Sequence, residues 1–239
     1  MKTVEVSFSP ALYGDKLTTG EFIVVIADIF RASTSICAAL DHGVKSVIPV
    51  EGIEEARLYK QKGFLVAGER DGRILEFADM GNSPSDFFKN DYRGKSIAYT
   101  TTNGTKIVHQ ASDAAEIVIG AFVNLSALAG WLMSRNRNVV IFCAAWKNLF
   151  NLEDAVFAGA LAEKLLAGGN YQTECDSLKA SSDLWKSARE DLHAYLLKSS
   201  HRNRLKHLMS DSDYQYAVTS DSVRVVPLLV NGRFENAGF

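Results

Sequence analysis

The sequence predicts an α/β protein, a three-layer α/β/α sandwich around a largely parallel or mixed central sheet. Short, continuous apolar runs of strand length recur between residues 22 and 143, as expected for strands that are covered on both faces. Helix-like stretches separate these runs, and strands that alternate with helices favour this fold class. Neither an internal repeat nor a low-complexity linker interrupts the 239 residues, so we expect a single domain over 1–239.

The candidate elements follow in chain order. The predicted strands are the apolar runs at 22–27, 46–50, 64–67, 96–100, 117–119 and 139–143. Between them, Ser33 or Thr34 is a candidate N-cap for a helix that Gly43 ends, and residues 54–62 form a second helical pattern. Ser83 followed by Pro84 is typical of a helix start, and apolar residues at helical spacing predict a helix over 152–166.

Residues 170–215 break this alternation. Their apolar spacing predicts one or two amphipathic helices, and we interpret the basic stretch 201–207 as a solvated helix face. Residues 223–230 predict a last strand that closes the sheet and exposes an apolar edge. We expect a homodimer, which is the usual behaviour of soluble enzymes.

The bulk composition excludes several classes of protein. A formal net charge of −2 argues against a nucleic-acid backbone as the main partner. No apolar run approaches the roughly 18 residues that span a bilayer, and the N-terminus lacks a signal-peptide pattern. We therefore expect no membrane partner and a cytoplasmic location. The three cysteines are widely spaced, which indicates neither a disulfide framework nor a zinc knuckle.

Polar residues follow the predicted strands one after another. In an open parallel sheet, ligands lie in the crevice beyond the carboxyl ends of the strands, so these side chains should converge there. Carboxylates with water and phosphate are the usual ligands of Mg²⁺, and Arg and Lys hold anionic groups. Backbone N–H groups at a helix start after 96–100 could form an anion cradle. The residues are Asp28, Arg31, Glu69, Arg70, Thr101, Thr102, Asn103, Gly104, Asn124 and Lys147, with Glu153 and Asp154 shortly beyond.

Each of these residues also has a purely structural interpretation. Asp28 could cap the following helix, and the Gly-containing turn after 96–100 is a common turn sequence. The acidic pair after the last strand could favour a helix dipole, and Lys147 could be an ordinary surface lysine. Their shared position after successive strands is what favours a functional site.

Several phosphate-handling mechanisms are excluded by their missing signatures. The segment Asp28-Ile29-Phe30 lacks the second aspartate of a DxD nucleophile motif. No cysteine is followed by the loop and arginine of cysteine-dependent phosphatases, and Lys89 stands where a P-loop needs its first glycine. No HExxH occurs. Attack by a metal-activated water or by an unrecognised side-chain nucleophile remains.

Five sequence blocks occur in the order and at the intervals of a known family. Over residues 4–168 the chain resembles the 2-phosphosulfolactate phosphatases, whereas residues 170–220 resemble them only loosely. The TTTNGT and NLEDAVFAGA segments are particularly distinctive. The blocks are VVIADIFRASTSI (24–36), AGERDGRILEFADMGNSPSDF (67–87), YTTTNGTK (99–106), IGAFVNLSAL (119–128) and CAAWKNLFNLEDAVFAGAL (143–161).

The resemblance implies Mg²⁺-dependent hydrolysis of (2R)-2-phospho-3-sulfolactate to 3-sulfolactate and phosphate, a step in coenzyme M biosynthesis. Carried over by the matching blocks, the metal or general-base candidates are Asp28, Glu69, Glu153 and Asp154, of which Asp28, Glu69 and Asp154 are the expected metal ligands. The expected substrate-binding residues are Arg31, Arg70, Asn82, Ser83, Thr101, Thr102, Asn103, Gly104 and Lys147.

Two positions depart from the family pattern. Asp71 stands where a small residue is expected, and Ala145 stands where a glycine is usual. These departures bear on the substrate more than on the reaction. The alternatives are therefore a phosphatase of another small phosphorylated hydroxy acid, and a non-catalytic binder of such anions.

Overall fold

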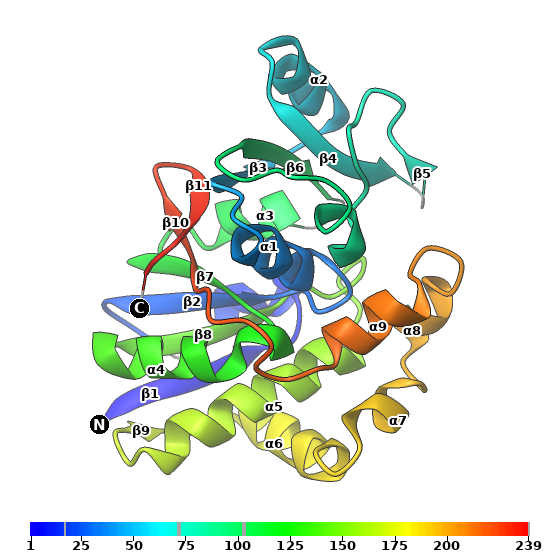
Figure 1. Ribbon diagram of the computed structural model, residues 1–239. Coiled ribbons are helices and arrows are strands. Elements are labelled where there is room, and N and C mark those ends of the chain that lie inside the picture. Colours follow the sequence, from blue (N-terminus) through cyan, green and yellow to red (C-terminus); the bar gives the residue numbers. More distant parts are fainter. Residues whose placement is uncertain (17, 71–72, 102–103, 239) are drawn as a thin grey trace.

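The computed structural model describes residues 1–16, 18–70, 73–101 and 104–238. The described strands form one mixed sheet in the order β5-β4-β6-β3-β11-β10-β7-β2-β8-β1-β9 (Figure 1). Their bounds are β1 (Lys2–Ser7), β2 (Phe22–Ala27), β3 (Ser46–Val50), β4 (Leu65–Arg70), β5 (Arg73–Ile74), β6 (Ser96–Thr100), β7 (Glu116–Gly120), β8 (Asn138–Cys143), β9 (Tyr171–Gln172), β10 (Pro227–Val230) and β11 (Arg233–Asn236).

The sheet consists of two parallel halves joined by a hairpin. Strands β9, β1, β8, β2 and β7 are mutually parallel, and so are β4, β6 and β3. The hairpin β10–β11 lies between them, antiparallel to β7 on one side and to β3 on the other. Each of these outer pairings is a single residue pair, Leu228 with Val118 and Phe234 with Val47. Three successive antiparallel pairings reverse direction, so the two halves run oppositely within the sheet.

The C-terminal hairpin corrects the expected last strand. A strand over 223–230 at an exposed edge is wrong, because β10 begins at Pro227 and both hairpin strands lie inside the sheet. Asn231 and Gly232 connect them, with φ of 49° and 76°. This is the conformation of a two-residue hairpin turn, for which Asn-Gly is the strongest sequence signal.

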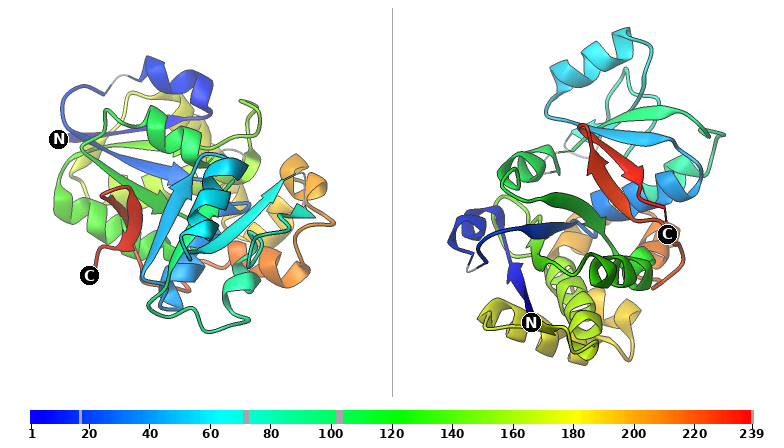
Figure 2. Two further views of the ribbon diagram at one scale, coloured as in Figure 1. Left: turned by 90° about the horizontal axis from the view of Figure 1, so that it is seen from above. Right: turned by 90° about the vertical axis from the view of Figure 1, so that its left-hand side faces the viewer.

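Helices cover both faces of the sheet, which confirms the predicted three-layer architecture (Figure 2). Helices α4 and α5 pack together, and α5 and α6 form the most extensive helix pair. At that pair the backbones approach so closely that a Cβ on Gly159 would lie 2.0 Å from the Ser181 carbonyl oxygen. The helix bounds are α1 (Ala32–Asp41), α2 (Ile53–Gln61), α3 (Gly104–Gln110), α4 (Leu125–Arg135), α5 (Leu152–Ala167) and α6 (Asp176–Ala188), with 3₁₀ turns η1 (Pro10–Asp15), η2 (Pro84–Phe87) and η3 (Phe122–Asn124).

The strands between residues 22 and 143 agree closely with the sequence prediction. Strands β2, β3 and β6 have the predicted bounds, and β2 is buried along its whole length, as a strand covered on both faces must be. Strands β1 and β9 were not predicted.

After α6 the chain forms three short helices, α7 (Leu192–Leu196), α8 (Ser200–Arg204) and α9 (Asp211–Ala217). The interpretation of residues 201–207 as a solvated face is wrong for His201, whose side chain is buried. We call residues 192–217 the helical cap. In the described part of the chain, no helix combines the length and apolarity needed to cross a membrane.

Candidate active site

The loop after β2 places Asp28 at the centre of the molecule. The Asp28 N–H donates to Ser33 Oγ at 2.9 Å, and Ser33 Oγ donates to the Ile26 carbonyl at 3.2 Å. The prediction that Ser33 or Thr34 is the N-cap of this helix is wrong. Both residues lie inside α1, whose N-cap is Arg31. Their hydroxyls hold the loop instead, and Thr34 Oγ1 donates to the Ile29 carbonyl at 2.9 Å.

A cavity of about 270 Å³ opens beside this loop. Its lining comes from the ends of β2, β4, β6 and β8 and from the helical cap, so both half-sheets contribute. The residues that line it are Asp28, Phe30, Arg31, Ala32, Glu69, Asn82, Tyr99, Thr101, Trp146, Lys147, His201, Arg204, Leu205 and Leu208. Six of the predicted site residues thus lie around one cavity: Asp28, Arg31, Glu69, Asn82, Thr101 and Lys147.

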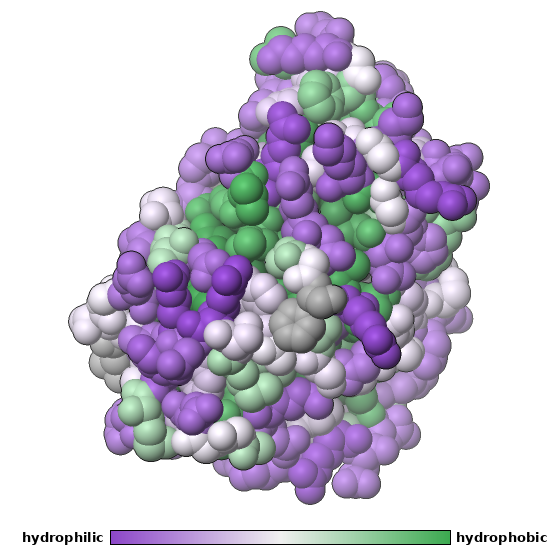
Figure 3. Space-filling view, turned by 60° about the vertical axis from the view of Figure 1, so that its left-hand side comes forward, coloured by the Kyte–Doolittle hydropathy of each residue, from purple (hydrophilic) through white to green (hydrophobic). Residues whose placement is uncertain are grey.

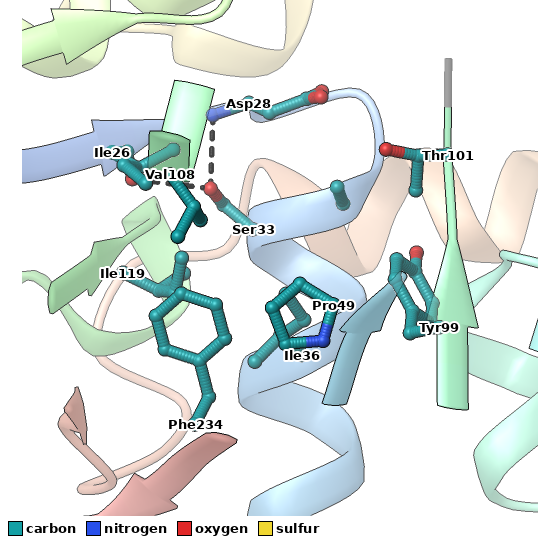
Figure 4. A pocket seen from close by; sticks show the side chains of 11 residues that line it. Ile26, Asp28, Ser33, Ile36, Pro49, Tyr99, Thr101, Val108, Ile119 and Phe234 are labelled. Carbon is teal, nitrogen blue, oxygen red and sulfur yellow. Dashed lines mark hydrogen bonds between the residues drawn. The ribbon is translucent and has the colours of Figure 1, made fainter. Parts of the chain in front are cut away.

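The Asp28 carboxyl stands over an apolar floor. Figure 4 shows Asp28 and Thr101 at the ends of β2 and β6, above Val108, Ile119 and Phe234. Burial is the largest cause that raises the pKa of Asp28, and the charge of Glu153 raises it further. His201, an N–H of Ala32 and Arg31 lower that pKa, but burial prevails. On the molecular surface, the face seen in Figure 3 carries a group of apolar side chains that polar side chains surround.

Arg31 connects the two half-sheets to the helical cap. Its guanidinium forms an ion pair with Glu69 at the end of β4. It also donates to Ser83 Oγ at 2.9 Å and to the Leu208 carbonyl at 2.6 Å. Because the arginine is buried and carries several hydrogen bonds, its planar fork fixes these segments relative to Asp28.

Glu153 and Asp154 begin α5 directly behind the cavity, and both are fully buried. Asp154 Oδ1 accepts from the Ile29 N–H at 2.9 Å, next to Asp28, and Oδ2 accepts from the Ala145 N–H at 3.3 Å. Burial, then the charges of Glu153 and Asp28, raise the pKa of Asp154 well above its usual value. The three carboxyls Asp28, Glu153 and Asp154 therefore form one electrostatic group.

The helical cap is anchored to this group by Glu153. Its Oε1 is 2.7 Å from His201 Nδ1, and its Oε2 accepts from Ser199 Oγ at 2.7 Å. A second anchor lies at α9, where Asp213 Oδ1 accepts from the Ser85 N–H at 2.9 Å. These contacts make the cap a fixed wall of the cavity.

Ala145 occupies a left-handed backbone conformation, with φ of 59°. Glycine adopts this conformation without the steric penalty of a Cβ, which gives a physical reason for the glycine expected at this position. Lys147 and Asn148 follow with φ of 51° and 63°, so the loop after β8 turns sharply and brings Lys147 to the cavity.

The remaining predicted residues lie around the cavity rather than in its lining. Arg70 donates to Thr100 Oγ1 at 3.2 Å, and Ser83 lines a neighbouring cavity that shares Arg31 and Glu69 with this one. Gly104 is the first residue of α3. Thr102, Asn103 and Asp71 lie outside the described residues.

The lining residues that sequence reasoning missed include Tyr99, Trp146, His201 and Arg204. Tyr99 and Trp146 lie within two residues of predicted site residues, so a search of the strand ends for aromatic residues would have found them. His201 and Arg204 carry no comparable local signal, because only the tertiary fold brings α8 to the strand ends.

The chemistry of the lining fits a small hard cation. The cavity has the Asp28 carboxylate and Asn82, whose Nδ2 donates to the Thr100 carbonyl at 3.2 Å. Among the described residues, the buried Asn82 Oδ1 has no hydrogen-bond partner. Mg²⁺ needs one or two protein oxygens, completed by water and phosphate. No three described His, Cys, Asp or Glu side chains are grouped so that they could hold a metal ion by themselves.

Comparisons with known proteins point to one family. A family model described as 2-phosphosulpholactate phosphatase matches residues 8–232. A probable 2-phosphosulfolactate phosphatase of Caldanaerobacter subterraneus subsp. tengcongensis is 36% identical over 213 residues, which cover 87% of this chain and 88% of the relative. A protein of the same description from Thermotoga petrophila is 35% identical over 88% of this chain and 90% of the relative. Another from Clostridium novyi is 32% identical over 85% of this chain and 87% of the relative.

Proposed function

Since the chain belongs to the 2-phosphosulfolactate phosphatase family, a family of phosphoric monoester hydrolases, we propose that it hydrolyses (2R)-2-phospho-3-sulfolactate to 3-sulfolactate and phosphate. The observation that carries this proposal is the cavity at the strand ends. It combines a buried carboxyl, Asp28, with the cations Arg31, Lys147 and Arg204, a set suited to a small, highly anionic phosphate ester.

We propose Mg²⁺ as the cofactor, held by the Asp28 carboxylate with Asn82 Oδ1 as a further oxygen donor. When bound, the ion supplies charge neutralisation for the phosphoryl group and lowers the pKa of a bound water. Its charge would also offset the mutual repulsion of Asp28, Glu153 and Asp154, which lie too deep for water to screen them.

The chain's own residues would then position the substrate. Arg31 is held by Glu69 and Ser83, so it presents a preorganised fork to the phosphate without a further loss of rotamer freedom. The Thr101 side chain lies next to Asp28 in the same lining. Glu153 and Asp154 act from behind, as groups that fix His201 and the Ile29 backbone. The helical cap contributes His201, Arg204 and Leu208 to the wall of the cavity.

Release of inorganic phosphate tests this function. The purified protein should hydrolyse phosphosulfolactate in the presence of Mg²⁺, lose the activity with EDTA and regain it when Mg²⁺ is restored. A panel of 2-phospholactate, phosphoglycolate and 3-phosphoglycerate separates the proposed substrate from other phosphorylated hydroxy acids. Higher kcat/KM on one of those compounds would reassign the substrate. Binding of all four compounds without any turnover would contradict the phosphatase.

We also propose a place in coenzyme M biosynthesis and a cytoplasmic location, and we propose a homodimer as the usual state of soluble enzymes. Sedimentation equilibrium of the purified protein tests the homodimer. Loss of intracellular 3-sulfolactate on deletion of the gene would support the pathway, and an unchanged level would contradict it.

A further inference from the structure

The indole ring of Trp146 carries two cations that reach it from different parts of the chain. Lys147 Nζ lies 4.7 Å from the ring centroid, and Arg204 Cζ lies 4.2 Å from it. Lys147 belongs to the sharp loop after β8, whereas Arg204 is the last residue of α8 in the helical cap. All three residues line the cavity that contains Asp28.

Lys147 and Arg204 both lack an anionic partner in the part of the chain that the structure describes. Within the described ranges, Lys147 and Arg204 form no ion pair, and the one hydrogen bond of the Arg204 guanidinium goes to the neutral Ser200 hydroxyl at 3.2 Å. Arg31, by contrast, is paired with Glu69. Two uncompensated positive charges therefore face the cavity, and they attract a second anionic group of the ligand.

The surroundings of Arg204 favour a particular kind of anion. Leu205 and Leu208 line the cavity on the same segment, and the Arg204 guanidinium lies over the Trp146 ring. A sulfonate spreads one permanent charge over three oxygens and is weakly hydrated, and a guanidinium is likewise weakly hydrated and offers a fork of donors. A sulfonate thus loses little hydration beside these apolar side chains.

We propose that Arg204 and Lys147, stacked on Trp146, form the site that recognises the sulfonate of the substrate, and that Arg204 is its main specificity determinant. This inference rests on the proposed function and deepens it. The helical cap would then carry the residue that distinguishes a sulfonated substrate from its unsulfonated analogue.

The position of Arg204 is fixed by the fold, which is what a specificity residue requires. His201 and Ser199, at the start of the same helix, are both bound to the buried Glu153. The Leu208 carbonyl, shortly after that helix, accepts from Arg31. The helix is therefore held at both ends, and the arginine is presented to the cavity at a defined place.

Kinetics on two substrates test the sulfonate site. For Arg204→Gln, the ratio of kcat/KM on phosphosulfolactate to kcat/KM on 2-phospholactate should fall about tenfold or more, the usual value of a charge-assisted hydrogen bond. The ratio for Arg204→Lys should lie between the ratios for Arg204→Gln and the wild type, because lysine keeps the charge but loses the fork of donors. Arg135→Gln and Lys198→Gln are matched controls, since each removes a cation stacked on an aromatic ring outside the cavity. An unchanged ratio in Arg204→Gln, or an equal loss on both substrates, would overturn the proposal.

A binding measurement separates this inference from the proposed function. Calorimetry with Mg²⁺ present should show that the wild type binds 3-sulfolactate more tightly than lactate, and that Arg204→Gln and Lys147→Gln lose this preference while both controls keep it. Equal binding of the two acids by the wild type would overturn the sulfonate site. If the preference is present but no phosphate is released, the sulfonate site stands and the phosphatase is wrong.

Discussion

Glu153 Oε1 and His201 Nδ1 lie 2.7 Å apart, although 48 residues separate them in the chain. Glu153 has no exposed surface, and its second oxygen is occupied by Ser199. This pair is the principal link between the helix that begins behind the cavity and the helical cap that lies over it. Removing Glu153 takes the carboxylate partner from both His201 and Ser199, which are buried.

Glu153→Ala should therefore lower the free energy of unfolding by about 3 kcal/mol, as for other buried polar pairs that lose one member. Urea titration followed by circular dichroism measures the effect. Glu190→Ala is the control, because Glu190 is exposed and its one ion pair within the described residues, with Arg189, is 3.7 Å long. A loss below about 1 kcal/mol, the scale of a surface ion pair, would show that the cap is held by other contacts.

Asp28→Asn should abolish most activity without unfolding the protein. Burial raises the pKa of Asp28, so the charged carboxylate is unfavourable in the folded state and its neutral isostere is not. We expect kcat/KM to fall by about 100-fold or more, as for a group that acts on the reacting centre. The melting temperature without Mg²⁺ should stay equal or rise. Full activity would remove Asp28 from the mechanism, and a lower melting temperature would contradict the electrostatic account.

The stability of the metal-free protein should fall as the pH rises. The pKa of Asp154 is raised well above its ordinary value by burial, whereas in the unfolded chain it is about 3.9. Below pH ~4 both states hold the proton, so the contribution of Asp154 is fully present there. Above that pH the unfolded state releases the proton first, and stability declines until the folded carboxyl also ionises.

Urea unfolding in EDTA between pH 5 and pH 8 measures this decline. The free energy of unfolding should fall less steeply with pH in Asp154→Asn than in the wild type. The remaining decline should come from Asp28, whose pKa is also raised. A slope in Asp154→Asn equal to that of the wild type would contradict the assignment.

Ala145→Gly should stabilise the protein. The φ of 59° at Ala145 imposes a steric cost of roughly 1–2 kcal/mol on a residue with a Cβ. The greater freedom of glycine in the unfolded chain offsets part of this, so we expect a net gain of about 0.5–1 kcal/mol in thermal unfolding. The neighbouring Ala144→Gly is the control, because Ala144 is buried at an ordinary φ and the same change there should destabilise. Loss of stability in Ala145→Gly would contradict the strain argument.

The parts of the fold that depend on local pattern were predictable. Strand β2 is buried on both faces, and its unbroken apolar run indicates this burial from the sequence alone. Strand β1 was missed because the prediction relied on continuous apolar runs, whereas Val4 and Val6 alternate with polar residues, including the buried Glu5. The hairpin β10–β11 was also missed, although Asn231-Gly232 between two apolar stretches is a recognisable turn signal.

The convergence of Asp28, Glu69 and Thr101 was predicted, but for an incomplete reason. The prediction assumed one parallel sheet with all carboxyl ends at one edge. The structure has two oppositely running halves, and Figure 4 shows β2 and β6 reaching the site from different directions. His201 and Arg204 were not predictable, because nothing in a basic segment indicates which residue will meet a glutamate on a distant helix.

The hairpin β10–β11 also determines when the molecule can be completed during synthesis. In the described part of the chain the two half-sheets meet edge to edge through this hairpin, and its residues 227–236 are translated after every other strand. The half that contains β3, β4 and β6 is continuous in the chain, whereas β2 pairs with β7 and β8, which are translated after that half. Once both halves have formed, β3 and β7 remain unpaired edges until the hairpin arrives. A nascent chain stalled before residue 227 would lack the hairpin that pairs the edges of the two halves, so those two edges are its exposed sites for chaperone binding or self-association.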